Sequence, residues 1–377
     1  MSAEIAPAEQ PLPVSVLTGF LGSGKTTVLR HLLCQPGMTK IAVIINEFGE
    51  IGIDHILVES TDESLVLLKN GCLCCTVRSD LVRALRSLYV RRTAGEIPDF
   101  DRVVVETTGL ADPASIVHCL LRDALLADCY RLDGVVTTVD AVTGTLTLDR
   151  HIEAVKQAAL ADRLVLTKTD LAAAPQIGAL TARLRAINPS APILCVVQGE
   201  VSAQALLNVG YYNPSTKSVE VRRWLDAEAY SGQGRHADDE TEEAQHVDAR
   251  DGHAAATHDR NRHDDHIRAF CLTYDAPVEW QTFAAAMEAL IGAHGSGILR
   301  VKGLLNVVGR ETPLVIHGVQ HLFHPPVLLD SWPDTDCRSR LVFITRDMEQ
   351  DFVARRLAPL WAPSATMDGA SDVRPVQ

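Results

Sequence analysis

A glycine-rich segment near the start of the chain carries the residue types that hold nucleotide phosphates. Residues 19–26, GFLGSGKT, match G-x-x-x-x-G-K-[ST] between an apolar run and a segment with helical spacing. Glycines let backbone amides turn inward around phosphates, Lys25 would reach the β- and γ-phosphates, and the Thr26 hydroxyl would bind Mg²⁺. The residues predicted to bind the nucleotide here are Gly19, Gly22, Ser23, Gly24, Lys25, Thr26 and Thr27.

Acidic residues in two segments could complete a hydrolytic site. Glu106 follows the apolar run 103–105 and precedes Thr-Thr-Gly, so we expect it at a strand end, acting on Mg²⁺ together with Thr26. A helix-capping Glu-Thr-Thr is the alternative interpretation. No side chain is marked as the one that orients the attacking water, so the catalytic candidates are Lys25, Glu50, Asp54 and Glu106.

A short motif after the apolar run 164–166 bears on the choice of base. Asp170 could accept hydrogen bonds from both N1 and N2 of guanine, for which adenine has no matching donors, while the Lys168 stem could cover the base face. Thr167 stands where the usual guanine motif has Asn, so one side-chain amide is missing. We predict that the nucleotide is GTP; an ordinary strand end followed by a helix cap is the alternative.

Three of the nine cysteines lie within four positions, at Cys72, Cys74 and Cys75. Cys72 and Cys74 would project to the same side of an extended segment, and Cys75 needs a bend. Thiolates favour Zn²⁺ and Cu(I), and three protein ligands leave a fourth position open, which suits transfer of the metal. We predict a metal site here; buried structural cysteines and a redox dithiol are the alternatives.

An acidic, glycine-rich segment, residues 46–54, lies between the phosphate loop and the cysteines. It follows an apolar run and has the composition of a loop that could respond to the nucleotide. Glu47 is a candidate extra ligand for either the transferred metal or Mg²⁺; a solvated loop carboxylate is the alternative. The other six cysteines lie in apolar or scattered contexts and are predicted to pack.

The elements that must position these residues alternate between strand and helix. Apolar runs of strand length occur at 14–18, 41–45, 103–105, 135–139, 164–166 and 193–197, with helical stretches such as 25–33, 80–91 and 175–187 between them. Such alternation predicts an α/β fold with a mainly parallel sheet covered on both faces. We assign residues 14–230 to this P-loop GTPase domain and residues 1–13 to a flexible N-terminus.

The composition changes between residues 231 and 266, which are rich in histidine and acidic residues and poor in large aliphatic ones. Such a segment buries too little surface to offset its ordering entropy, so we predict a disordered linker. Its histidines alternate with carboxylates and could capture Zn²⁺, Co²⁺ or Ni²⁺ weakly; an acidic tether with incidental histidines is the alternative.

The remainder, residues 267–362, predicts a smaller α+β domain, followed by a flexible tail at 363–377. Strands are expected at 267–274, 298–308, 314–323 and 340–344, and helices at 277–291 and 348–357. His317, His321 and His324 would lie on or beside these strands, either packing or binding a metal.

Charge and hydropathy narrow the range of partners. The net charge of −13 argues against a broad nucleic-acid surface. No apolar run approaches the roughly 20 residues that span a bilayer, and the N-terminus lacks the features of a secretory signal. We therefore expect no membrane partner, a cytoplasmic location and reduced thiols.

Together these motifs resemble the CobW-type GTPases, a family of nucleotide-dependent metallochaperones, over nearly the whole chain. The resemblance rests on GFLGSGKTT, INEFGEIGID, NGCLCC, ETTGLADP, TKTD and, in the second domain, RVKGLLNV. It implies GTP hydrolysis coupled to delivery of Zn²⁺ or Co²⁺ to a client metalloprotein. GTP and Mg²⁺ would order residues 47–54 and so reshape the neighbouring Cys72–Cys75 site.

Other functions remain open at this point. A cobalt-handling GTPase for cobalamin synthesis or for nitrile hydratase would share every motif. A P-loop kinase of a small metabolite would make the thiol cluster incidental, and a passive metal buffer would make nucleotide turnover negligible.

Overall fold

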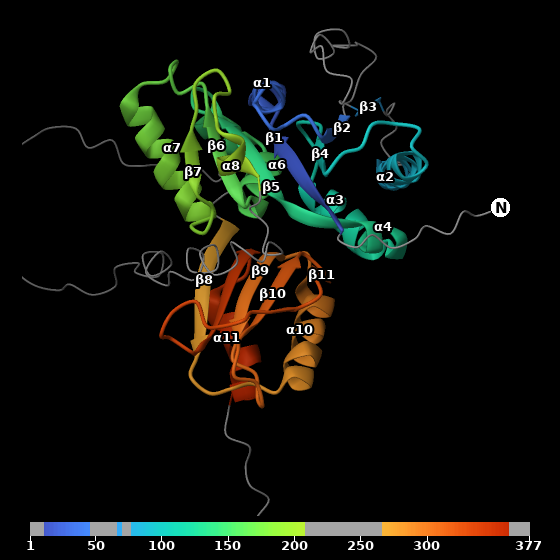
Figure 1. The fold of residues 1–377 in the computed structure, drawn as a ribbon. Helices are drawn as coiled ribbons and strands as arrows, with labels where there is room; N and C mark the ends of the chain where they lie inside the picture. The colour runs from blue at the N-terminus through green and yellow to red at the C-terminus, as the bar shows by residue number, and fades with distance from the viewer. Residues whose placement is uncertain (1–10, 46–65, 70–76, 208–265, 362–377) are drawn as a thin grey trace, which may run out of the picture.

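The computed structural model describes residues 11–45, 66–69, 77–207 and 266–361. These residues form an α/β domain, blue to green in Figure 1, and a C-terminal domain, orange to red. None of the described helices is long and apolar enough to cross a membrane.

The α/β domain contains the strands β1 (Leu12–Gly19), β2 (Ile41–Ile45), β3 (Val66–Lys69), β4 (Arg102–Glu106), β5 (Tyr130–Asp140), β6 (Arg163–Thr167) and β7 (Ile193–Cys195). Its helices are α1 (Lys25–Leu33), α2 (Val77–Thr93), α3 (Pro113–Arg122), α4 (Ala124–Cys129), α5 (Gly144–Arg150), α6 (Ile152–Leu160), α7 (Ala174–Ile187) and α8 (Ala203–Leu206).

The strands of this domain form one sheet in the order β3-β2-β4-β1-β5-β6-β7. Every described strand pair in it is parallel, which confirms the predicted α/β fold. The strand order changes direction around β1, and in parallel sheets ligands bind at the carboxyl ends of the strands beside such a point. The phosphate loop leaves β1 at this edge.

Alternate side chains of each strand bury against opposite layers of helices, because successive residues point to opposite faces. Val104 and Val136 join the cluster that contains Leu29 of α1. Val103 and Val105 belong to the cluster that contains the apolar sides of α2 and α3. Helices therefore cover both faces of the sheet. One of them is α1, which follows the phosphate loop and packs against the sheet.

The C-terminal domain contains β8 (Ile267–Tyr274), β9 (Ile298–Leu305), β10 (Leu314–Val319), β11 (Leu322–Phe323), β12 (Val327–Leu328) and β13 (Ser339–Arg346). Its helices are α10 (Trp280–His294), α11 (Gln350–Leu357) and the 3₁₀ helix η3 (Ala358–Trp361). The strands pair antiparallel in the order β11-β10-β9-β13-β8, and β12 pairs with β10.

One predicted strand of this domain is wrong in detail. Residues 314–323 form two antiparallel strands, β10 and β11, instead of one. The reason is a tight turn at Gln320, whose φ of 52° places it in the left-handed region that ends a strand. The turn faces the α/β domain, where Gln320 contacts Asp112.

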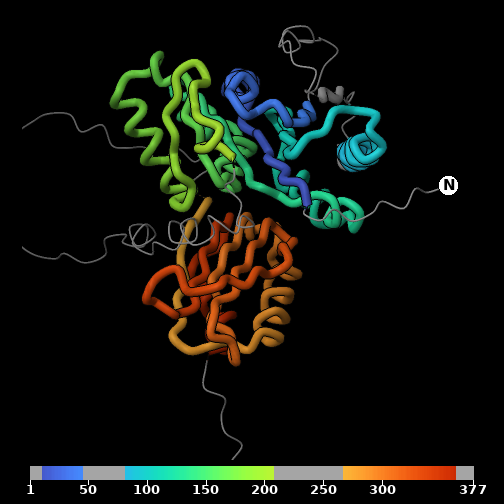
Figure 2. Tube along the Cα trace, viewed as in Figure 1, coloured from blue at the N-terminus to red at the C-terminus, as the bar shows by residue number. Residues whose placement is uncertain are grey.

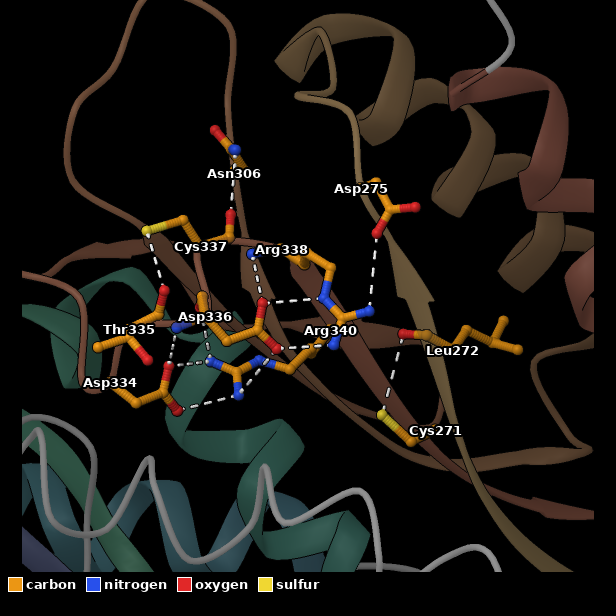
Figure 3. Close-up of polar contacts among 10 residues, drawn as sticks. All are labelled: Cys271, Leu272, Asp275, Asn306, Asp334, Thr335, Asp336, Cys337, Arg338 and Arg340. Carbon is orange, nitrogen blue, oxygen red and sulfur yellow. Dashed lines mark hydrogen bonds and ion pairs between the residues drawn. The ribbon is translucent and has the colours of Figure 1, made fainter.

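A short loop before β13 is fastened by ion pairs, shown in Figure 3. Both Nη atoms of Arg340 donate to the Asp334 carboxylate at 3.0 Å, and the Arg338 Nε donates to Asp336 at 2.9 Å. The hydrogen bonds from Arg338 lower the pKa of the Asp336 carboxyl. Bidentate pairs of this kind fix direction as well as distance, so they hold the loop in one conformation. The loop leads into β13, which lies between β9 and β8 in the sheet.

The two domains share a hydrophobic core. α10 and α11 cover one face of the C-terminal sheet, with Phe283 and Val353 in their cluster. The opposite face places Leu299 and Val342 in the same cluster as Leu180 of α7 and residues of α6. The trace in Figure 2 shows the C-terminal sheet lying directly against the α/β domain.

A buried carboxylate adds a polar contact to this interface. Asp162, just before β6, faces Arg300 and Lys302 of β9; the Lys302 Nζ lies 3.4 Å from its Oδ1. Arg300 also donates to the Leu160 carbonyl, and Asp162 accepts the N–H of Val135 at 3.0 Å. Burial alone would raise the pKa of Asp162, but the two cations outweigh it and hold the pKa below its usual value.

Candidate functional site

The phosphate loop has the backbone shape that its glycines predict. Gly19, Gly22 and Gly24 have φ values of 142°, 72° and 88°, a region that L side chains rarely adopt. A Cβ on Gly19 would lie 2.3 Å from the Thr138 Oγ1, closer than any real contact. The ammonium of Lys25 donates to the carbonyls of Gly19 and Phe20 at 3.0 and 3.1 Å, so it lies over this loop.

The structure brings together the two side chains predicted to share Mg²⁺. The Thr26 Oγ1 donates to the Glu106 Oε1 at 2.7 Å, although 80 residues separate them in sequence. This follows from the parallel pairing of β1 and β4, in which Leu17 lies opposite Glu106. A hydroxyl and a carboxylate are oxygen ligands of the kind that Mg²⁺ prefers, so this donor set fits the ion.

The segment after Glu106 packs directly on the phosphate loop. The Thr107 Oγ1 donates to the Thr18 Oγ1 at 2.8 Å. A Cβ on Gly109 would lie 2.6 Å from the Leu21 backbone nitrogen, so only glycine allows this approach. The phosphate loop therefore cannot move towards Gly109 without displacing it.

The same segment is fastened to the C-terminal domain. Asp112 caps α3 by accepting the N–H of Ala114 at 3.0 Å, and its other oxygen accepts from the Gln320 side chain at 3.3 Å. Further along α3, the His118 Nε2 lies 3.1 Å from the Val319 carbonyl oxygen. The end of β10 and the turn after it thus contact α3, which begins four residues after Gly109.

The predicted base-recognition motif contacts the phosphate loop. The Thr167 hydroxyl donates to the Ser23 carbonyl at 2.8 Å and to the Val139 carbonyl at 3.2 Å. Thr167 is buried, whereas Asp170 is exposed at the same end of the sheet. The hydroxyl therefore ties the two loops together without the amide of the usual asparagine.

A functional candidate that sequence reasoning missed is Asp140, the last residue of β5. Its Oδ2 accepts from the Lys168 ammonium at 2.7 Å, and the same ammonium donates to the Gly22 carbonyl at 2.9 Å. The signal was present, because Asp140 directly follows the apolar run 135–139, just as Glu106 follows 103–105. An acid at a strand end marks this edge of the sheet in both places.

Several predicted site residues lie outside the described residues: Glu47, Glu50, Asp54, Cys72, Cys74, Cys75 and the histidines of 231–265. The strands that lead to them are described. Ile45, the last residue of β2, pairs with Glu106 of β4 on one side and with Lys69 of β3 on the other. Both segments therefore start at the edge of the sheet that carries Glu106.

Two of the three histidines predicted beside strands of the C-terminal domain lie in the protein interior. His317 and His324 are buried, with ring centroids 6.3 Å apart in an edge-on arrangement. Burial lowers the pKa of His317 well below its usual value and that of His324 to about 4. Among the described residues, no group of three or more His, Cys, Asp or Glu side chains could hold a metal ion.

The fold and the phosphate loop define the class of protein, a P-loop GTPase with a second, antiparallel domain. Two family models match the chain: "CobW/HypB/UreG, nucleotide-binding domain" over residues 13–195 and "Cobalamin synthesis protein cobW C-terminal domain" over residues 267–360. The zinc chaperone YjiA of Escherichia coli K12 is 33% identical over 93% of this chain and 99% of its own length. The chain therefore belongs to the CobW family of GTPases.

One further relative and one solved structure agree with this assignment. The zinc chaperone CobW of Pseudomonas aeruginosa is 30% identical and covers 92% of this chain and 90% of its own length. The crystal structure of Zn(II)-bound YjiA GTPase from E. coli matches with a TM-score of 0.66 at 30% identity, over 93% of this chain and 99% of that one. The likeness extends through both domains, as the sequence motifs predicted.

Proposed function

We propose that this GTPase is a metallochaperone that carries Zn²⁺ at Cys72, Cys74 and Cys75 and delivers it to a client metalloprotein. The observation that carries the proposal is the pairing of Ile45 with both Glu106 and Lys69. Cys72 follows Lys69 by three residues, which span at most about 11 Å of chain. The chain that leads to the motif therefore leaves the sheet at β3, one strand from β2, which leads to Glu47, and two strands from β4, which ends at Glu106.

The hydrolytic role of the site follows from its charges. Lys25 and the inward amides of the glycine-rich loop would stabilise the charge that develops on the γ-phosphate. Thr26 and Glu106 would hold Mg²⁺, which would supply positive charge to offset the negative charge of the phosphates. Gly109 lies against Leu21 of the phosphate loop, so the segment between Glu106 and α3 is in direct contact with the loop that would hold the phosphates.

Coupling between nucleotide and metal is expected to be reciprocal. If GTP orders residues 47–54 beside the thiol motif, then the nucleotide changes metal affinity by some factor and the metal changes nucleotide affinity by the same factor. The names of the relatives support Zn²⁺ as the cargo: several are zinc chaperones and the yeast relatives are zinc-regulated GTPase metalloprotein activators. Co²⁺ is the second candidate, because the same ligands accept it.

Zinc titration of the full chain tests this proposal. We expect zinc affinity to differ about 5- to 150-fold between a non-hydrolysable GTP analogue and GDP, the range of typical allosteric couplings. Replacing Cys72, Cys74 and Cys75 with serine should abolish that difference. Cys337→Ser is the matched control, since this exposed thiol lies on the C-terminal domain and should leave the difference intact.

Weak zinc binding by the histidine-rich segment would add a background that does not depend on the nucleotide. Equal zinc affinities with the GTP analogue and with GDP in the wild-type chain would contradict the proposal. Metal analysis of the purified protein then separates Zn²⁺ from Co²⁺ as the cargo.

A further inference from the structure

Asp140 has a partner that lies in the base-recognition motif. β5 and β6 are neighbours in the sheet (Figure 1), and Asp140 pairs with Thr167 in their parallel register. The next residue, Lys168, has a φ of 55°, in the left-handed region that non-glycine residues rarely adopt. A strained backbone at such a point persists only where the surroundings hold it.

The Asp140 carboxylate is itself held in one orientation. Its Oδ1 accepts the N–H of Val142 at 2.8 Å and that of Thr143 at 3.4 Å, so the start of the next loop fixes the group. Its side chain is 10% exposed, whereas that of Lys168 is 39% exposed. The second oxygen, Oδ2, is left to face the Lys168 ammonium at 2.7 Å.

The Lys168 ammonium therefore has two fixed acceptors on two different elements, Asp140 at the end of β5 and the Gly22 carbonyl in the phosphate loop. With its far end anchored, the four-carbon stem has few rotamers left. A lysine stem that is free in solution loses substantial rotamer entropy when it packs against a ligand. Anchoring the ammonium removes that loss before the nucleotide arrives.

We propose that Asp140 is a positioning residue for nucleotide binding. It holds the Lys168 stem in place before the nucleotide binds, so that the stem is ready to pack against the face of the base. This inference rests on the proposed base site at Lys168 and Asp170. It assigns to Asp140 a role in affinity for the purine ring and none in the choice between purines, because the stem meets the face of the ring and not its edge. The competing explanation is a purely structural link between β5 and β6.

Steady-state hydrolysis by the full chain separates these explanations. In Asp140→Asn, the KM for GTP should rise about tenfold, the loss expected when one lysine stem must be ordered at each binding event, with kcat within threefold of wild type. The KM for ITP, whose base lacks the 2-amino group, should rise by the same factor. Asp99→Asn is the matched control: this carboxylate pairs with Arg92 at 2.7 Å before the start of β4, the end of that strand opposite to Glu106, and its removal should leave both KM values unchanged.

A double-mutant cycle tests whether Asp140 acts through Lys168. In a Lys168→Met background, adding Asp140→Asn should raise KM by less than twofold, because the ammonium that it holds is already absent. A full tenfold rise in that background would overturn the proposal, and so would a kcat loss with KM unchanged. If Asp140→Asn does not fold, Lys168→Met alone still tests whether the anchored Lys168 stem contributes to binding. It should raise the KM for GTP and the KM for ITP by the same factor.

Failure of the underlying base site has a different signature. Asp170→Asn exchanges an acceptor for a donor, and the amide matches the C2 carbonyl of xanthine in place of the amino group of guanine. It should shift preference from GTP towards XTP. If it does not, the base site lies elsewhere, whatever Asp140→Asn does; if it does and the cycle is additive, only the role of Asp140 is wrong.

Discussion

Lys25→Ala is expected to lower the rate of GTP hydrolysis by a factor on the order of 100 to 1,000, the cost of removing one preorganised charge from a transition state. The ammonium lies over the phosphate loop, bonded to the Gly19 and Phe20 carbonyls, where it would meet the β- and γ-phosphates. Release of free phosphate under saturating GTP measures the effect.

The matched control is Lys40→Ala. Lys40 is 59% exposed and lies 3.9 Å from Asp99 on the surface, so its loss should change the hydrolysis rate by less than about twofold, as for other weak surface pairs. Zinc binding without nucleotide should be retained in Lys25→Ala, because the thiols do not depend on this lysine. Undiminished hydrolysis in Lys25→Ala would show that the phosphate loop is not part of the catalytic site. Full rescue of metal-limited cells by this variant would favour a passive metal buffer.

Asp162→Asn is expected to be the most destabilising single change at the domain interface. It would leave Arg300 and Lys302 buried without their carboxylate, and breaking a buried pair in this way costs about 3–5 kcal/mol. For a chain of this size, that corresponds to a fall in Tm of about 5 °C. Thermal unfolding at pH 6 with a fluorescent dye measures it.

The pH dependence of this effect has a definite sign. The pKa of Asp162 is depressed in the folded protein, so its contribution is present above the pKa of an unfolded aspartate, about 4, and is lost as the pH falls through the folded pKa. The difference in Tm between wild type and Asp162→Asn should therefore shrink below about pH 4. Asp99→Asn is the control, since its 63% exposed carboxylate should contribute less than about 1 kcal/mol; an equal loss from both variants would contradict the buried role of Asp162.

The parts of the candidate site that could be predicted are those whose residues are adjacent in the sequence. The phosphate loop needs its glycines, lysine and threonine side by side, so the motif and the strand and helix around it are visible together. Glu106 was found because a strand end followed by Thr-Thr-Gly is also a local pattern. The α/β alternation likewise followed from runs of strand length.

Contacts between distant residues were beyond such reasoning. Asp140 and Lys168 are 28 positions apart, and nothing in either segment names the other. Asp162 and Arg300 are 138 positions apart and meet only because the C-terminal sheet packs on α6 and α7. Pairing of this kind is decided by how whole surfaces fit.

Three elements were not predicted, and only the first of them had a clear signal in the sequence. Asp112 followed by Pro113 is the usual start of a helix, with an acidic cap and proline in the first turn, and α3 begins there. β3 is only four residues long, so its pattern is too short to separate from a loop. The turn at Gln320 was hidden because glutamine is not a residue that favours positive φ.

The shared core between the domains has a consequence for how this chain can change over time. The face of the C-terminal sheet that carries Leu299 and Val342 is filled by side chains of α6 and α7. A change in side-chain volume in one domain must be compensated by a change in the other domain, since packed interiors tolerate little misfit. The sequences of the two domains should therefore change together during evolution. A C-terminal domain transplanted from a relative would need that relative's α6 and α7 as well.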